Sequence, residues 1–428
     1  MPDKNTGTTW FTNKNARCLW YAGACISAAM WMLQITVALH VVATAGTSAL
    51  ATLLLVGTLP TLFLMPFAGL AADRFKVHRL ARTGVAVQLC AVVGMALAVN
   101  LDSLVALAVT FAVQGMALSF WAPSRQQWLY TLIEPEMRQK ANAAIGTLNG
   151  AMVIVGAIGA GVVSLWSSTV SIFAVTGLLG MALMQLLRVD VIPPAADTSS
   201  QDGPIAVRRH VSDFIAGLRD GLGATQRFPL ARSVIWIGMA WGLIGGGYTV
   251  LVNGHIIENF NGDSLTVAAV FTGDGLAVII ATLLAGRLPR QRHLPVWALC
   301  YVLQGLLWAA FFLAPNLYLA VAFLVLMRFV GGFIIALDTT ILLETVPPEY
   351  RGRVTSLHIT TYNAMARVSL AALGAALAIV SLVWVGIIAG VMAALCGVIW
   401  WYTSGRRAGE AYLKAAKAPE VSLRSESS

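Results

Sequence analysis

The feature that most constrains this chain is a series of long apolar runs, each about the length of a membrane-crossing helix. About 20 apolar residues at a rise of 1.5 Å each span the ~30 Å hydrocarbon core of a bilayer. In lipid, a helix satisfies all of its backbone N–H and C=O groups within one segment, so each run predicts a transmembrane helix. The runs cover residues 17–42, 48–72, 79–100, 103–131, 141–166, 169–189, 232–253, 265–286, 295–314, 318–345, 355–380 and 383–403. The sequence therefore predicts an all-α polytopic membrane protein with 12 transmembrane helices.

The composition agrees with this interpretation. Hydrophobic residues make up 58% of the chain and charged residues only 11%, whereas a soluble domain carries about 25% charged residues. So few charged side chains cannot cover the surface of a soluble protein of this length.

The basic residues predict the orientation of the chain in the membrane. Of the 28 Lys and Arg residues, three lie well inside predicted spans, at Arg125, Arg328 and Arg367. The other 25 lie at the N-terminus, in the loops from even to odd spans and the span ends beside them, or in the C-terminal tail. Because cytoplasmic loops are enriched in Lys and Arg, we expect both termini to be cytoplasmic. Topology thus explains the net charge of +9, and the charge does not indicate a nucleic acid partner.

One long polar interval, between the sixth and seventh spans, separates two groups of six spans. It opens with "IPPAADTSSQDGP", and apolar residues then recur every three or four positions over residues 207–222, which predicts a basic amphipathic helix on the membrane surface. The expected parts are a cytoplasmic N-terminus (1–16), an N-terminal six-helix bundle (17–189), a cytoplasmic linker (190–231), a C-terminal six-helix bundle (232–403) and a cytoplasmic tail (404–428).

The two halves also resemble each other. The stretch "PEMRQK" follows the fourth span from Pro135, and "PEYRGR" follows the tenth from Pro348, 213 residues later. Internal duplication of six spans is typical of secondary transporters. We therefore expect two pseudo-symmetric six-helix bundles.

The loop after the second span carries a motif. Residues 69–79, "GLAADRFKVHR", resemble the G-x-L-A-D-R-x-G-R-K loop of the major facilitator superfamily. The stretches "FWAPSRQQWLYTLIEPEMRQKANAAIGTLNG" and "LLETVPPEYRGRVTSLH" are similar to the branch of that family that holds the enterobactin exporter and macrolide efflux pumps. The resemblance runs from Asn15 to about Tyr402. It implies a secondary transporter that works by alternating access.

The resemblance also implies that this loop acts as a cytoplasmic latch. Asp73 would meet the N-terminus of the eleventh span, near Thr355, where a carboxylate is stabilised by the helix dipole. Arg74 and Arg79 would pair with Glu134 or with the neighbouring acid at position 136. The alternative is a plain charged turn that follows the excess of positive charge on the inner side.

A second charge cluster is expected in the other half. Asp338 and Glu344 approach the cytoplasmic end of the tenth span, where we expect them to join Arg351 and Arg353. The complete predicted latch comprises Gly69, Asp73, Arg74, Arg79, Glu134, Glu344, Arg351 and Arg353.

Three ionisable residues lie near the middle of their spans. Asp274, Arg328 and Arg367 would each cost at least about 2.5 kcal/mol to insert, so we expect each to face a partner or an aqueous cavity. Asp274 is either a protonatable carboxylate or half of a structural ion pair with one of the two arginines. Arg328 either binds an anionic group of the substrate or belongs to that pair.

Two glutamines lie on spans that line the cavity in the family resembled. Gln34 and Gln114 are expected either to hydrogen-bond the substrate or to join helices by packing bonds.

No enzyme motif survives inspection. "NGDSL", residues 261–265, resembles a hydrolase nucleophile block as a string, but a helix N-cap by Asp263 or Ser264 explains it better. The chain has no phosphate-binding loop, no metal-ligand spacing and no C-x-x-C, so we expect no cofactor and no metal.

The function expected is proton-coupled efflux of small amphiphilic solutes, either drugs or siderophores, by a monomer in a bacterial inner membrane. The export direction comes from the branch resemblance, and the mid-span arginines favour an anionic solute. Metabolite uptake by the same fold, or a membrane sensor that does not transport, remain alternatives.

Overall fold

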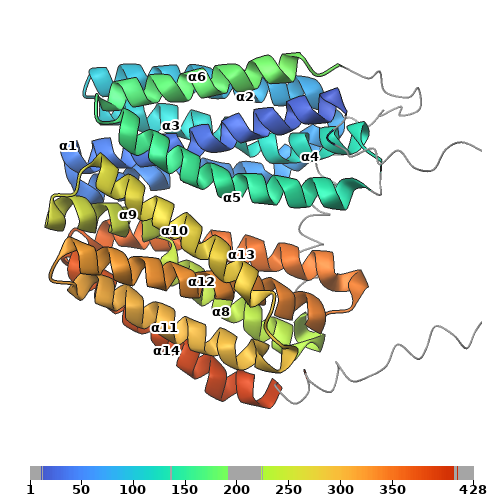
Figure 1. Cartoon of the computed structure of the whole chain (residues 1–428), viewed down its shortest axis with the longest axis vertical. Helices are drawn as coiled ribbons and strands as arrows, with labels where there is room; N and C mark the ends of the chain where they lie inside the picture. Colours follow the sequence, from blue (N-terminus) through green and yellow to red (C-terminus); the bar gives the residue numbers. More distant parts are fainter. Residues whose placement is uncertain are drawn as a thin grey trace, which may run out of the picture. The chain divides into compact units, whose positions relative to one another are not determined.

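The computed structural model of the chain is built from α-helices (Figure 1). It describes residues 11, 13–134, 137–190, 223, 225–408 and 412, and these residues contain no β-strand. The predicted amphipathic helix at residues 207–222 lies outside the described residues. The helices are α1 (Lys14–Arg74), α2 (Val77–Asn100), α3 (Leu104–Ser119), α4 (Trp121–Leu132), α5 (Arg138–Val163), α6 (Ser168–Leu187), α8 (Pro229–Gly245), α9 (Tyr248–Gly254), α10 (Ser264–Ala285), α11 (His293–Leu313), α12 (Leu317–Thr345), α13 (Pro348–Ala376) and α14 (Leu382–Trp400). Short π-helical or 3₁₀ turns are η3 (His255–Asn259), η4 (Arg290–Arg292) and η5 (Trp401–Gly405).

All 12 predicted runs are helical, which confirms the all-α class. Nine helical segments in the described part of the chain are long and apolar enough to cross a membrane. The segment Lys14–Thr61 contains the first predicted span and part of the second. The described apolar part of α5, Thr147–Val163, is just too short to be counted, and α13 begins with the polar stretch "PEYRGR".

Two predicted runs are interrupted. The run 103–131 consists of α3 and α4, which meet at Phe120. Pro123 stands in the first turn of α4, where its missing N–H leaves no intrahelical hydrogen bond unmade. The run 232–253 consists of α8, α9 and the π-helical turn η3, so helical structure continues to Asn259.

A glycine separates the first two spans within α1. Gly46 has φ 81° and ψ 172°, a conformation that an L side chain rarely adopts. Thr47 starts the next helical segment, and both its backbone N–H and its hydroxyl donate to Oε1 of Glu258, at 2.9 and 2.6 Å. The carboxylate therefore caps the second half of α1.

The contacts divide the chain into two compact units. The first contains residues 1–214 and 249–275, and the second contains residues 215–248 and 276–428. Residues 249–275 thus group with the first unit, although the sequence divides the chain at the linker. The predicted bundle bounds, 17–189 and 232–403, stay a prediction.

In the first unit, α1 is the central element. It packs against α3, α5 and α6, and α2 packs against α3 and α6. Thr36 of α1 and Ser171 of α6 are fully buried and share a hydrogen bond of 2.6 Å between their hydroxyls. Apolar side chains such as Leu33, Val92 and Ile172 fill the remaining interior.

In the second unit, α11 packs against α12 and α14, and α8 packs against α13. Trp297 of α11 is fully buried. Its ring meets those of Tyr301 and Trp400 edge to face, at centroid distances of 5.0 and 4.5 Å. The contact between Trp297 and Trp400 joins α11 to α14.

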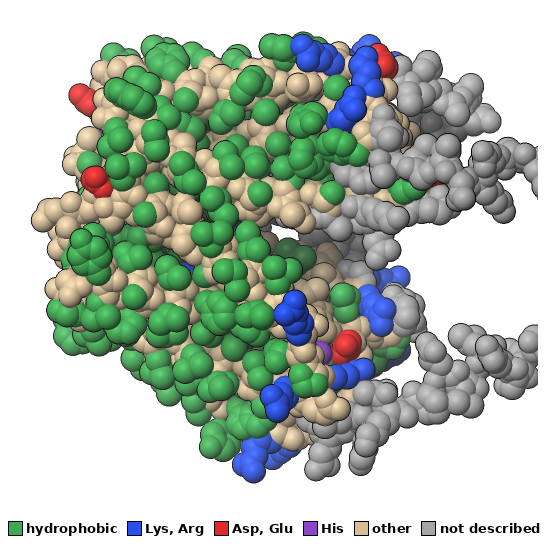
Figure 2. Space-filling model, viewed as in Figure 1, with side chains coloured by type: hydrophobic (Ala, Val, Ile, Leu, Met, Phe, Trp, Pro, Cys, Tyr) green, Lys and Arg blue, Asp and Glu red, His purple; other side chains and the backbone are tan. Residues whose placement is uncertain are grey.

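The outer surface is apolar, as expected for a membrane protein. Figure 2 shows hydrophobic side chains over the outer faces of the helices, whereas most visible Lys and Arg side chains gather near helix ends. Exposed side chains on these faces include Leu283, Leu326 and Leu395. In water such faces would be costly, and in a bilayer they are the expected surface.

Candidate functional site

The second unit encloses a cavity of about 430 Å³. Its wall comes from α8, α11, α12, α13 and α14, together with Tyr248 at the start of α9. A volume of this size is within the usual range for small-molecule sites. The polar and aromatic lining residues are Trp241, Tyr248, Tyr301, Gln304, Trp308, Arg328, Asp338, Thr339, Thr355, His358 and Tyr362.

The cation of the cavity is Arg328, on α12. The central carbon of its guanidinium lies 5.0 Å from the ring centroid of Tyr248. Such a cation–π contact is worth about 2 kcal/mol when desolvated. The N–H donors of a guanidinium form a planar fork whose geometry suits a carboxylate or phosphate.

An acid and an imidazole pair across two helices in the same cavity. Nε2 of His358, on α13, lies 2.7 Å from Oδ2 of Asp338, on α12. Both side chains are largely buried, at 14% and 17% exposure. In the described part of the chain, Oδ1 of Asp338 and Nδ1 of His358 have no hydrogen-bond partner. The pair thus leaves one carboxylate oxygen and one ring nitrogen buried without a hydrogen-bond partner among the described residues.

The histidine fits only because of a glycine on α8. A Cβ placed on Gly238 would lie 2.4 Å from Cε1 of His358 and 3.0 Å from its Nδ1. Since real Cβ atoms essentially never come so close, any larger residue at position 238 would displace the ring.

Aromatic side chains form much of the remaining wall. Tyr248 and Trp308 lie with centroids 5.5 Å apart, and Trp241 meets Tyr301 edge to face at 5.9 Å. The Oε1 atom of Gln304 is buried and has no hydrogen-bond partner among the described residues. The cavity therefore combines apolar surface with a small number of polar groups, which suits an amphiphilic ligand.

The structure brings one predicted pathway residue into this cavity. Arg328 lines it, whereas Arg367 does not, although it lies on α13 and is half-buried. Asp274 is buried at 7% exposure on α10 in the first unit. Because the two arginines belong to the second unit, the predicted pairing with Asp274 stays a prediction.

The two predicted glutamines lie in the first unit. Gln114 of α3 is buried, and its Nε2 lies 2.8 Å from Sδ of Met30 on α1. This contact agrees with the packing alternative. Gln34 is half-buried on α1.

The second predicted charge cluster is wrong for Asp338, which pairs with His358 in the cavity instead of joining Arg351. Glu344 contacts other basic groups, Arg290 at 3.3 Å and His293 at 4.0 Å. Nearness in sequence predicted that Asp338 joins the arginines, whereas the packing of α12 against α13 brings it to His358, at a similar depth.

Arg351 donates from Nε to the carbonyl of Val346 at 3.2 Å, so it closes the turn between α12 and α13. Arg353 is exposed on α13.

The predicted latch is only partly described. The side chains of Gly69, Asp73 and Arg74 are not among the described ones. Arg79 and Glu134 are both exposed, and no ion pair joins them within the described residues. The contact expected between Asp73 and the start of α13 would join the two units and stays a prediction.

Sequence reasoning missed His358, Tyr248 and the role of Asp338. A signal for the pair was available. Asp338 lies seven residues before the end of α12, and His358 lies ten residues after the start of α13. At 1.5 Å per residue, two helices joined by a short turn bring these positions to similar depths, about 10 and 15 Å from the turn.

Comparison with known proteins gives the family. The sequence model of the Major Facilitator Superfamily matches residues 19–253 and again residues 235–425. Together the two matches span nearly the whole chain. The chain belongs to the major facilitator superfamily. It is thus a multi-pass membrane protein and a transporter, not an enzyme.

Solved structures of the family's fold agree with this assignment. A variant of the nucleoside transporter NupG is 12% identical, with a TM-score of 0.69, over 90% of this chain and 99% of that one. A POT family transporter in complex with 5-aminolevulinic acid is 11% identical, with a TM-score of 0.69, over 92% and 96% of the two chains. A bacterial homologue of the human lysosomal transporter Spinster, inward-facing and unoccupied, is 14% identical, with a TM-score of 0.64, over 96% and 99%.

At such identities the similarity establishes the major facilitator fold and not a substrate. No curated protein matches the chain.

Proposed function

We propose that this transporter exports small amphiphilic organic solutes, of the drug or siderophore class, by proton-coupled alternating access. The observation that carries the proposal is the cavity of the second unit, where Arg328, the Asp338–His358 pair and several aromatic rings line one space. An amphiphilic solute with an acidic group matches this lining, because the rings take its apolar body and the guanidinium takes its anionic group.

The acid–imidazole pair supports coupling to protons. When Asp338 is ionised and His358 is protonated, the two charges cancel. A proton that enters Asp338 neutralises the carboxylate and leaves the imidazolium charge in the cavity. Since a charge in a low-dielectric site interacts strongly with its surroundings, this step changes the affinity for an anionic solute. Asp274 remains a second candidate for the proton carrier.

Proton flux measured in proteoliposomes tests which residue carries the proton. We expect Asp338→Asn and His358→Gln to abolish substrate-driven proton flux. Asp274→Asn separates the two candidates, since normal flux in this variant removes Asp274 as the carrier. Asp102→Asn makes the same charge change at an exposed loop position and serves as the control. Full coupled flux in Asp338→Asn would contradict the role given to the pair.

The direction is tested in inside-out vesicles. An exporter accumulates the solute inside them when their interior is acidic. The proposal of export is supported by the similarity of residues 120–150 and 342–358 to the exporter branch. Accumulation only in right-side-out vesicles with acid outside would identify an uptake permease. Failure to move any drug, chelator or metabolite would favour a sensor.

We further propose that both termini are cytoplasmic, that the membrane is a bacterial inner membrane, and that the transporter is a monomer. The support for the orientation is the one-sided distribution of 25 of the 28 Lys and Arg residues. Reporter fusions within residues 190–231 test the orientation. A reporter found outside the cell would show that the orientation is the reverse of the one proposed.

A further inference from the structure

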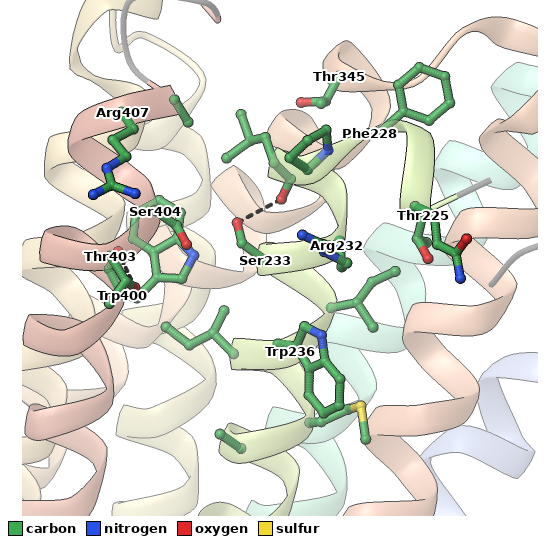
Figure 3. Close-up of a pocket in the computed structure, with 18 of the residues that line it drawn as sticks. Thr225, Phe228, Arg232, Ser233, Trp236, Thr345, Trp400, Thr403, Ser404 and Arg407 are labelled. Carbon is green, nitrogen blue, oxygen red and sulfur yellow. Dashed lines mark hydrogen bonds between the residues drawn. The ribbon is translucent and has the colours of Figure 1, made fainter. Parts of the chain in front are cut away.

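A second and larger hollow lies on the other side of α8. It has a volume of about 1350 Å³ and runs between α8 and α14 with its extension η5 (Figure 3). Residues from the ends of α12 and α13 complete the wall. We call this hollow the α8–α14 groove.

One end of the groove is basic. Arg227, Arg232 and Arg407 line it, all three exposed, together with small polar residues such as Thr225 and Ser404. In Figure 3, Arg232 and Arg407 stand on opposite walls of the groove. Among the described residues, no ion pair or hydrogen bond engages any of the three guanidinium groups.

The groove holds little negative charge to balance these arginines. Glu344 is the one carboxylate in its described lining. Its carboxylate is already engaged by Arg290 at 3.3 Å and by the hydroxyl of Tyr412. The basic end thus carries surplus positive charge and suits an anion.

The other end of the groove is apolar. Trp236, Met239 and Ala240 line it from α8, and Cys396 and Ile399 line it from α14. Trp236 is 62% exposed and Ile399 58% exposed, so the described part of the chain leaves these apolar side chains uncovered.

The length of the groove matches one leaflet of a bilayer. Eight residues of α8 separate Arg232 from Ala240, which corresponds to about 12 Å along the helix axis. Eleven residues separate Cys396 from Arg407 on the opposite wall, which corresponds to about 16 Å. One leaflet contributes about half of the ~30 Å hydrocarbon core. A ligand that fills the groove is therefore anionic at one end and apolar along the remaining length.

We propose that the α8–α14 groove binds an anionic phospholipid of the surrounding bilayer. The phosphate lies among Arg227, Arg232 and Arg407, and an acyl chain runs along α8 past Trp236. Basic pockets between transmembrane helices are a recognised type of site for anionic headgroups. A free phosphate would leave the apolar length of the groove empty.

A segment of the chain itself fits less well. The amphipathic stretch 207–222 is the obvious internal candidate, but its three arginines outnumber its two aspartates, so its net charge has the same sign as the groove's basic end.

The lipid also bears on the cavity, because α8 separates the two. Gly238 of α8 lines the cavity beside His358, while Ile237 and Met239 line the groove. Leu357 and Thr361, on either side of His358 in α13, belong to the groove as well. A bound lipid therefore holds the wall against which the histidine packs.

Native mass spectrometry of the full-length protein with phosphatidylglycerol tests the proposal independently of transport. The variant Arg232→Gln/Arg407→Gln removes two charges from the groove. The matched control, Arg287→Gln/Arg292→Gln, removes two charges from exposed arginines outside it. An arginine that contacts an anionic headgroup contributes about fivefold to lipid binding, so we expect about a 30-fold loss in the first variant. The control arginines do not line the groove, so we expect little change there.

The apolar end is tested separately. Ala240→Phe narrows the groove without changing charge, and we expect it to weaken the binding of long-chain phosphatidylglycerol while short-chain lipid binds as before. Phosphatidylcholine, which has no net charge, should bind weakly to every variant.

Several results would overturn the proposal. Equal losses in the two double variants would indicate general surface charge. Unchanged binding in both would exclude the groove. Full competition by inorganic phosphate would indicate a soluble anion, and a gain of lipid binding on deletion of residues 205–222 would indicate that this segment covers the groove.

Discussion

Replacement of Gly46 by alanine tests the break that turns one long helix into two spans. The residue has φ 81° and ψ 172°, in a region used essentially by glycine alone, where another residue costs about 1–3 kcal/mol. A Cβ there would meet only Oε1 of Glu258, at 3.8 Å, which is an ordinary contact. The cost is therefore conformational and not steric.

The net effect is somewhat smaller than the backbone strain. Alanine also restricts the unfolded chain, which stabilises the folded state by about 0.4–1 kcal/mol. We expect Gly46→Ala to lower the free energy of unfolding by about 1–2 kcal/mol. Gly177→Ala is the matched control, because Gly177 lies within α6 and a Cβ there meets nothing within 4 Å. It should raise the stability by up to about 1 kcal/mol.

The measurement is a denaturant titration of the purified full-length protein in detergent, followed by the fluorescence of its 13 tryptophans. The two substitutions add the same methyl group and should change stability in opposite directions. If Gly46→Ala were as stable as Gly177→Ala, the strained backbone at position 46, and with it this account of the break, would be refuted.

Three further predictions concern charged side chains. Arg328→Lys keeps the charge but loses the planar guanidinium that lies over the ring of Tyr248, so the KM for an anionic solute should rise about tenfold, for about 1–2 kcal/mol of lost contact, in a transport assay. Glu258→Gln weakens the cap on the second half of α1, and the unfolding free energy should fall by about 1 kcal/mol. The hydroxyl and backbone N–H of Thr266 donate to Asp263 and lower the pKa of this exposed carboxyl. Asp263→Ala should therefore cost about 0.5–1 kcal/mol at pH 7 in denaturant titrations. The folded pKa is depressed, so this stabilisation is present above the unfolded pKa of about 4 and is lost as the pH falls through the folded value.

Each of these has an outcome that would contradict it. An unchanged KM in Arg328→Lys would mean that the contact with Tyr248 does not position the guanidinium for substrate. A stable Glu258→Gln protein would show that a neutral amide oxygen caps Thr47 equally well. A stability difference between the parent and Asp263→Ala that persists at pH 2 would exclude the ionised cap.

The helix caps at Asp263 and Thr47 differ in whether the sequence alone could predict them. The sequence predicted a helix N-cap at Asp263 or Ser264, and the bonds from Thr266 to Asp263 confirm it. A cap is formed by residues three positions apart, so it is visible in a short string. The cap on Thr47 comes from Glu258, 211 residues away, and no local pattern indicates it.

The breaks within predicted spans could not be predicted from the sequence either. Apolar character predicted the run 103–131, but hydropathy does not distinguish one helix from α3 and α4 in series. The π-helical turn His255–Asn259 likewise follows no apolar signal.

What the sequence by itself determined is the set of lipid-crossing helices, because each must be long, apolar and internally hydrogen-bonded, whatever its neighbours are. It also indicated Arg328 as a candidate site residue, since a charge in an apolar run is visible without a structure. Only the tertiary structure decided which groups meet. Asp338 could pair with any nearby base by sequence, and the packing of α12 on α13, with Gly238 of α8 leaving room for the ring, selected His358. Pairing depends on depth and on helix rotation, and both are set by side-chain packing between segments that no single segment encodes.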